Sequence, residues 1–170
     1  MKIHVIIILI ITFTVFTNES YSQSSEELFN RAVSKEQSGD YAGAIQDLSK
    51  AIEINPNYAI AYQYRGYVKA ILDDHREAIK DYNKAIKIDP NSQNVFFNRG
   101  MSKSKIDDHR GAIQDYNKAI ENYNEDADAY FNRGLSYGIL GQINNACRDL
   151  KKAHEMGRFD ARKLIINFCN

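Results

Sequence analysis

The sequence predicts an all-α fold, an α-solenoid of four repeats closed by a C-terminal capping helix. Stretches recur at one constant separation, from position i to i+34: KDYNKAI at 80–86 returns as QDYNKAI at 114–120, and FNRG at 97–100 returns at 131–134. Within each unit, small and large apolar residues are spaced i, i+4, i+7, which places them on one helical face. The only two prolines, Pro56 and Pro90, have the same separation.

Residues 1–22 are expected to be a cleaved signal peptide. Lys2 provides a positive start, residues 3–16 form an apolar run, and Ser20 and Ser22 are small residues before the expected cleavage point. Fourteen helical residues would span about 21 Å, less than the ~30 Å hydrocarbon core of a bilayer. An uncleaved membrane anchor is therefore the weaker alternative. The chain from Gln23 onward is expected to be soluble and exported, either periplasmic or secreted.

The residue pattern inside each unit resembles the tetratricopeptide repeat (TPR), which implies a helix–turn–helix unit. The resemblance implies a domain over residues 23–158, with repeats at about 25–58, 59–92, 93–126 and 127–158. The first helices carry a large and then a small residue: Leu28 and Ala32, Tyr62 and Gly66, Phe96 and Gly100, Tyr130 and Gly134. The second helices carry an apolar triplet: Ala44, Leu48 and Ala51; Ala78, Tyr82 and Ala85; Ala112, Tyr116 and Ala119; Ala146, Leu150 and Ala153. Proline ends the first two units, and Asn124 and Arg158 replace it in the others.

The stretch DDHR occurs at 73–76 and again at 107–110, where the repeat pattern places the turn between two helices. Asp40, Asp74 and Asp108 are predicted to cap the second helices, and Glu77 suggests a capping box with Asp74. His75 and His109 replace an aromatic residue beside the turn. A weak metal site shared by the two histidines is the alternative, and we prefer the structural interpretation.

Each unit carries an arginine at a position i of its first helix and an aspartate at i+16 in its second helix. Antiparallel helices would bring the two positions face to face, so we predict structural ion pairs, either inside or between repeats. The alternative is a row of arginines that binds anions, but every unit also carries an acid. The residues concerned are Arg31, Asp47, Arg65, Asp81, Arg99, Asp115, Arg133 and Asp149.

Residues 159–170 are expected to form the capping helix, with Ala161, Leu164, Ile165 and Phe168 on its apolar stripe. Gly157 is the expected end of the preceding helix. Cys147 and Cys169 are almost equally far from Gly157, so antiparallel packing would bring them together as a disulfide. Alternatively, Cys147 is a buried small residue at the position of earlier isoleucines.

The resemblance also implies that the stacked first helices line a concave groove that binds a peptide or a partner's helix. The predicted groove residues are aromatic, amide and thioether side chains that suit an extended peptide. They are Phe29, Asn30, Gln63, Tyr64, Tyr67, Phe97, Asn98, Met101, Phe131 and Asn132, flanked by Val33 and Leu135. Some of them could instead pack between adjacent helices. The lysines and asparagines that clamp a chaperone's terminal carboxylate in other family members are missing here.

These observations predict a non-enzymatic protein–protein interaction module, a scaffold or adaptor. The formal net charge is zero, which gives no electrostatic reason to expect nucleic acid as a partner. No catalytic motif is present, and we expect no cofactor and no metal. RDLKKAHEMG at 148–157, followed by a short helix, resembles exported bacterial repeat proteins. The alternatives are a self-associating structural solenoid and a membrane-tethered assembly factor that retains residues 1–22.

Overall fold

The computed structural model describes residues 24–123 and 126–169, so the predicted signal peptide lies outside the described residues. Within these ranges the chain forms nine α-helices and no β-strand. The helices are α2 (Ser25–Gln37), α3 (Tyr41–Ile54), α4 (Ala59–Ile71), α5 (His75–Ile88), α6 (Gln93–Lys105), α7 (His109–Asn122), α8 (Ala127–Ile139), α9 (Ile143–Glu155) and α10 (Ala161–Phe168). In this part of the chain, no helix has the length and apolarity needed to cross a membrane.

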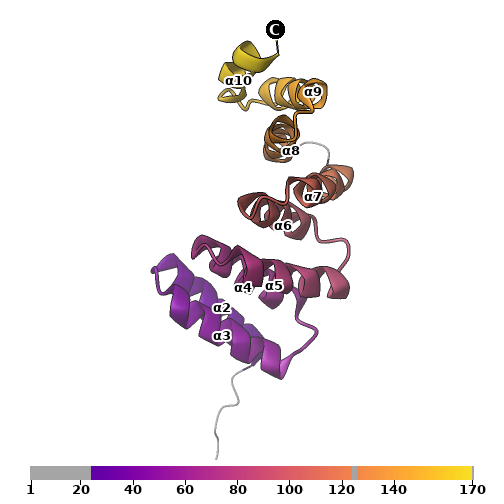
Figure 1. Ribbon diagram of the computed structural model, residues 1–170. Coiled ribbons are helices and arrows are strands. Elements are labelled where there is room, and N and C mark those ends of the chain that lie inside the picture. The colour runs from indigo at the N-terminus through magenta and orange to yellow at the C-terminus, as the bar shows by residue number, and fades with distance from the viewer. Residues whose placement is uncertain (1–23, 124–125, 170) are drawn as a thin grey trace, which may run out of the picture.

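The helices stack in chain order from α2 at one end to α10 at the other (Figure 1). Each helix packs against the helices before and after it, and the first helices α4, α6 and α8 also contact one another in sequence. Within the described residues the main contacts therefore join neighbouring repeats, as expected of a solenoid. The predicted all-α solenoid with a terminal capping helix is confirmed.

The core of each repeat forms where a large side chain of the second helix reaches the small residue of the first. Tyr82 and Tyr116 are almost completely buried, at 1% exposure each, and they lie against Gly66 and Gly100. A Cβ atom added at Gly66 would lie 2.8 Å from the Tyr82 ring. Glycine is therefore required where the facing residue is tyrosine, because any side chain at that position would collide with the ring.

This contact predicts opposite outcomes for one substitution made in two repeats. Gly100→Ala should lower the free energy of unfolding by about 1–3 kcal/mol, because its Cβ would lie 2.9 Å from the Tyr116 ring. In Gly134→Ala the new Cβ would lie 3.2 Å from the Leu150 side chain. The first repeat already has alanine at this position, where Ala32 and Leu48 are both buried. The cost of this close contact in Gly134→Ala should be offset by helix propensity, which favours alanine over glycine by ~1 kcal/mol. Urea denaturation of both variants tests this, and equal destabilisation would contradict it.

The aspartates of the turns cap the second helices. Asp40 and Asp108 each accept a hydrogen bond of 2.9 Å from the backbone N–H at i+3, and Asp74 accepts one of 3.4 Å from Glu77. The capping box predicted at Asp74 is wrong: the Asp74 N–H donates to the carbonyl of Lys69, and the Glu77 carboxylate pairs with Lys80. A complete capping box instead begins α2, between Ser24 and Glu27.

Candidate functional site

Each arginine of the periodic row binds the aspartate of its own repeat through two hydrogen bonds. Arg99, for example, donates from Nε and Nη2 to the two carboxylate oxygens of Asp115, at 2.8 and 2.6 Å. The four aspartates are buried, and the same bidentate geometry joins Arg31 to Asp47, Arg65 to Asp81, and Arg133 to Asp149. Each arginine is therefore already paired with a carboxylate of the chain, which argues against the alternative of an anion-binding row.

We call the four arginine–aspartate pairs the ion-pair ladder. Side chains at two further periodic positions also belong to it, and the sequence alone did not lead us to predict them. Lysines at i+4 from the arginines bind the same aspartates in the first three repeats, at 2.7–2.9 Å: Lys35, Lys69 and Lys103. The remaining guanidinium nitrogen donates to the preceding repeat, from Arg65 to Ser49 at 3.0 Å, from Arg99 to Asn83 at 2.7 Å, and from Arg133 to Asn117 at 2.7 Å. The ladder thus holds each repeat together and also joins it to its neighbour. The signal that could have found these positions was the repeat period itself, which they share with the arginines.

Because of the Arg31–Asp47 pair, the free energy of unfolding should decrease at acid pH. Hydrogen bonding from Arg31 lowers the pKa of Asp47 from 3.8 to about 2. Because the folded-state pKa is depressed, the stabilisation is present above pH 3.8 and is lost as the pH falls toward 2. Asp47→Asn should therefore be clearly less stable than the unmodified chain at pH 7, and the difference should shrink steadily below about pH 4. Denaturant titrations across this range test it, and a constant difference would contradict it.

The DDHR turns are structural elements. Asp73 and Asp107 adopt the left-handed conformation, with φ of 61° and 64°, at the positions where Gly39 and Gly141 stand in the other turns. His109 is buried, and its Nδ1 lies 3.3 Å from the Ser104 hydroxyl. Within the described residues no group of three or more histidine, cysteine, aspartate or glutamate side chains could hold a metal ion.

Aromatic side chains of the predicted groove meet across the first two repeats. The ring centroids of Phe29 and Tyr64 are 5.5 Å apart, and those of Tyr64 and Tyr67 are 5.6 Å apart. The Tyr64 hydroxyl donates a 3.0 Å hydrogen bond to Glu36 of α2. Burial and this carboxylate raise the pKa of Tyr64 to about 12, so its phenol stays protonated at neutral pH.

This aromatic cluster opens onto a pocket of about 420 Å³ between α2, α4 and α6. We call it the groove pocket. Its lining brings together several of the predicted groove residues with two residues that the prediction did not include, Glu36 and Asn94. The lining consists of Glu36, Gln63, Tyr64, Tyr67, Asn94, Phe97 and Asn98. Met101 lines a neighbouring cavity with Tyr67 and Asn98.

The predicted groove residues of the fourth repeat have other partners. The guanidinium of Arg158 lies over the Phe131 ring, 4.4 Å from its centroid, and also pairs with Asp128. The Asn132 side chain donates to the carbonyl of Asp128 in its own helix, at 2.8 Å. The open part of the groove is therefore in the first three repeats.

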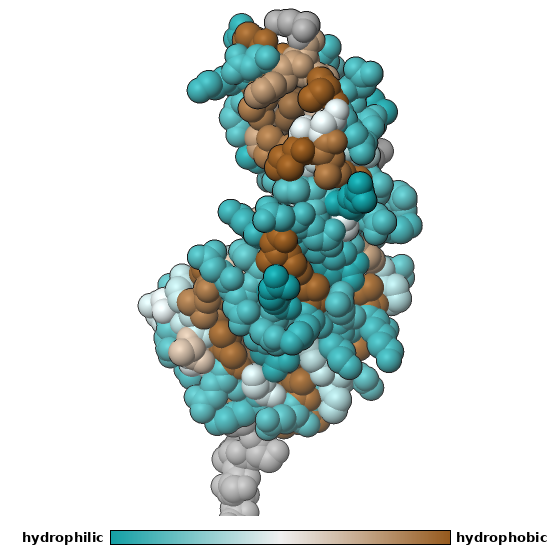
Figure 2. Space-filling model, viewed as in Figure 1, coloured by the Kyte–Doolittle hydropathy of each residue, from teal (hydrophilic) through white to brown (hydrophobic). Residues whose placement is uncertain are grey.

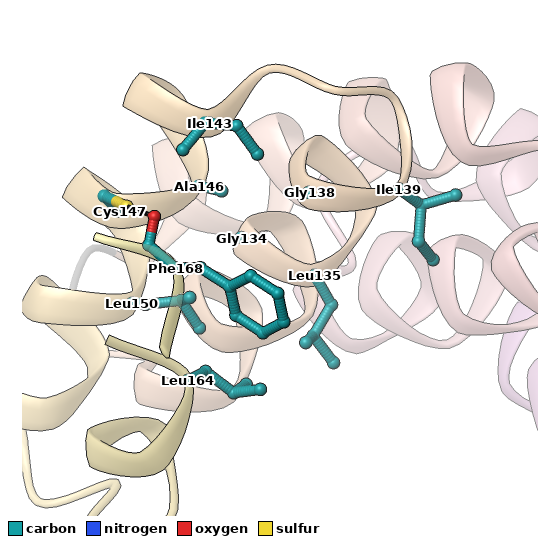
Figure 3. A pocket seen from close by; sticks show the side chains of 10 residues that line it. All are labelled: Gly134, Leu135, Gly138, Ile139, Ile143, Ala146, Cys147, Leu150, Leu164 and Phe168. Atoms are coloured by element: carbon teal, nitrogen blue, oxygen red, sulfur yellow. Dashed lines mark hydrogen bonds between the residues drawn. The ribbon is translucent and has the colours of Figure 1, made fainter. Parts of the chain in front are cut away.

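The C-terminal end carries a separate apolar pocket of about 320 Å³ between α8, α9 and α10. The Phe168 ring of α10 points toward Leu135 in this pocket, which Leu150 also lines (Figure 3). Figure 2 shows apolar surface gathered at this end of the solenoid. A disulfide between Cys147 and Cys169, with an S–S distance of 2.06 Å, fastens α10 to α9.

The fold and this site define a class of protein, a helical-repeat solenoid with a groove along its first helices. Four tetratricopeptide repeat models match the sequence, at residues 37–71, 59–92, 94–126 and 115–148. Together they span residues 37–92 and 94–148, more than half of the chain. The chain belongs to the tetratricopeptide repeat family.

Solved structures with this fold include MamA, with 25% identity, a TM-score of 0.76 and 81% of each chain covered. MamA from Desulfovibrio magneticus RS-1 has 17% identity and a TM-score of 0.76, covering 81% of this chain and 78% of its own. The first TPR domain of Spaghetti (RPAP3), solved with the HSP90 peptide SRMEEVD, has 19% identity and a TM-score of 0.69, covering 71% of this chain and 95% of its own. A search of curated proteins found no match.

Proposed function

We propose that this protein is a non-enzymatic interaction module, an exported scaffold or adaptor that binds a peptide or a partner's helix in its concave groove. The observation that carries the proposal is the groove pocket, where the rings of Tyr64, Tyr67 and Phe97 lie beside three side-chain amides. Aromatic rings supply contact area, and amides hydrogen-bond main-chain groups. A related fold, the RPAP3 domain, was solved with a peptide bound, which supports the same use here.

Export is the second part of the proposal, and it rests on residues 1–22. The disulfide between Cys147 and Cys169 supports it, because disulfides persist in oxidising compartments. We propose a periplasmic or secreted location and a partner in the same compartment. Mass spectrometry of the protein purified from its native host tests this. Gln23 as the first residue supports export, whereas an intact residue 1–22 segment favours the membrane-tethered alternative.

Affinity capture followed by a binding measurement tests whether a partner binds in the groove. The full-length chain serves as bait in native envelope extract, the captured protein is purified, and its affinity for the bait is measured by calorimetry. Phe97→Ala should weaken binding at least about tenfold, the effect of losing one buried aromatic anchor. Tyr123→Ala is the matched control, because Tyr123 is 49% exposed and lies at the end of α7, outside the groove pocket.

Equal affinity of the bait and of Phe97→Ala would place the interface elsewhere and contradict the proposal. Recovery of the bait's own chain alone would favour the second candidate, a self-associating solenoid. The observation behind that candidate is the apolar C-terminal end, where Ile139 and Phe168 are 65% and 60% exposed. Sedimentation of the purified chain decides it, since a monomer at all concentrations excludes self-association.

A further inference from the structure

Glu36 gives the groove pocket a negative charge that no ion pair in the described part of the chain neutralises. It is the one pocket-lining side chain with a formal charge at neutral pH, the others being amides, tyrosines and a phenylalanine. Within the described residues its partner is the neutral hydroxyl of Tyr64, which binds Oε2, and Glu36 forms no ion pair there. This sets Glu36 apart from the ladder aspartates, which are matched by arginine in every repeat and also by lysine in the first three.

The rings beside Glu36 offer a second attraction for a positive charge. Tyr64 and Tyr67 lie tilted against each other at 5.6 Å, and Phe97 lines the same pocket from α6. The faces of aromatic rings carry negative charge density and attract ammonium and guanidinium groups within about 6 Å. Tyr67 is 39% exposed, so its ring is accessible to a partner's side chain.

The fourth repeat already shows this kind of recognition between two parts of the chain. Arg158 stacks over the Phe131 ring at 4.4 Å while its guanidinium pairs with Asp128. Phe131 is the equivalent of Phe97 one repeat later, in the same register position of the first helix. Asp128 is likewise the equivalent of Asn94, which lines the groove pocket. In the fourth repeat, an arginine side chain thus lies against the equivalents of Phe97 and Asn94, two residues that line the groove pocket.

We infer that the groove pocket takes a lysine or arginine side chain of the partner, stacked on Tyr64, Tyr67 or Phe97 and paired with Glu36. This inference rests on the proposed function and adds the chemistry of the partner to it. Asn98 and Gln63 lie beside the rings and offer amides to the main chain that flanks the cationic residue. A peptide whose only charges are carboxylates is disfavoured, because the lining of the pocket offers it a carboxylate and no cation.

An NMR titration of the full-length chain with two small probes tests the charge preference directly. The probes are N-acetyl-arginine methylamide and the citrulline equivalent, which has nearly the same shape without the charge. The arginine probe should shift the signals of Tyr64, Tyr67, Phe97 and Asn98 and should bind at least about threefold tighter than the citrulline probe. Equal affinity for the two probes, or shifts confined to other parts of the chain, would overturn the inference.

Three variants separate the charge from the rings. Glu36→Gln keeps an oxygen that can accept from Tyr64, and Tyr67→Leu keeps apolar bulk without the aromatic ring. Each should reduce the preference for arginine over citrulline by about half or more. Glu53→Gln is the matched control, since it changes the net charge equally at an exposed position of α3 outside the pocket lining, and it should leave the preference unchanged. An equal loss in Glu53→Gln would overturn the inference.

The two proposals fail in different experiments. Equal binding of the arginine and citrulline probes overturns the inference, even if Phe97→Ala weakens binding of the captured partner as expected. Conversely, if Phe97→Ala leaves the partner's affinity unchanged while the arginine probe is preferred, the proposed function fails and the cationic preference of the pocket stands.

Discussion

Asp115→Ala is expected to lower the free energy of unfolding by about 3–5 kcal/mol, the largest effect we predict for a single residue. Asp115 is only 3% exposed, accepts two hydrogen bonds from Arg99 and forms an ion pair with Lys103. Both cations are themselves mostly buried, at 16% and 18% exposure. Removal of the carboxylate leaves two positive charges in the core with no counter-charge. Urea denaturation followed by circular dichroism measures the loss.

Two comparisons show whether the stranded charge is the cause. The triple variant Arg99→Leu, Lys103→Leu and Asp115→Leu removes all three charges together and should recover most of the stability, since apolar replacement of a buried ionic group is often neutral. Glu121→Ala removes an exposed acid of the same helix that pairs with Lys118, and should cost no more than about 1 kcal/mol. If Asp115→Ala cost as little as Glu121→Ala, the ladder would have no structural importance.

Reduction of the disulfide between Cys147 and Cys169 is expected to release α10 from the stack. The helix has eight residues, and Ala161 is its one buried side chain, so its own packing contributes little. Helices of this length are not stable alone in water. The disulfide joins residues 22 positions apart, and in the loop-entropy account such a link contributes about 3 kcal/mol. Hydrogen exchange with and without reductant measures the protection of the α10 amides.

The effect of reduction should stay local. Because the main contacts of each described repeat are with its neighbours, exchange in α2–α5 should not change when α10 is released. Cys147→Ser combined with Cys169→Ser should match the reduced protein and should not respond to reductant. Unchanged protection of α10 in the reduced protein would show that Phe168 and Leu164 hold the helix without the covalent link.

Much of this fold could be predicted from the sequence, because a constant repeat period places equivalent residues in equivalent environments. The repeat period, together with an i, i+4, i+7 apolar face, defines the repeats, and the constant offset between each arginine and its aspartate places the two opposite each other. Cys147 and Cys169 are almost equally far from Gly157, so antiparallel packing of the two helices predicts that they meet, and the structure places them in a disulfide.

The tertiary structure alone decided the contacts that break or cross this period. It placed the arginine–aspartate pairs inside each repeat and their third hydrogen bond between repeats, a choice that the common spacing left open. It also joined Glu36 to Tyr64 and Arg158 to Phe131, residues whose separations do not correspond to the repeat. Periodicity specifies which positions face the groove, but only the packing of individual side chains decides which of these positions are covered and which remain open to a partner.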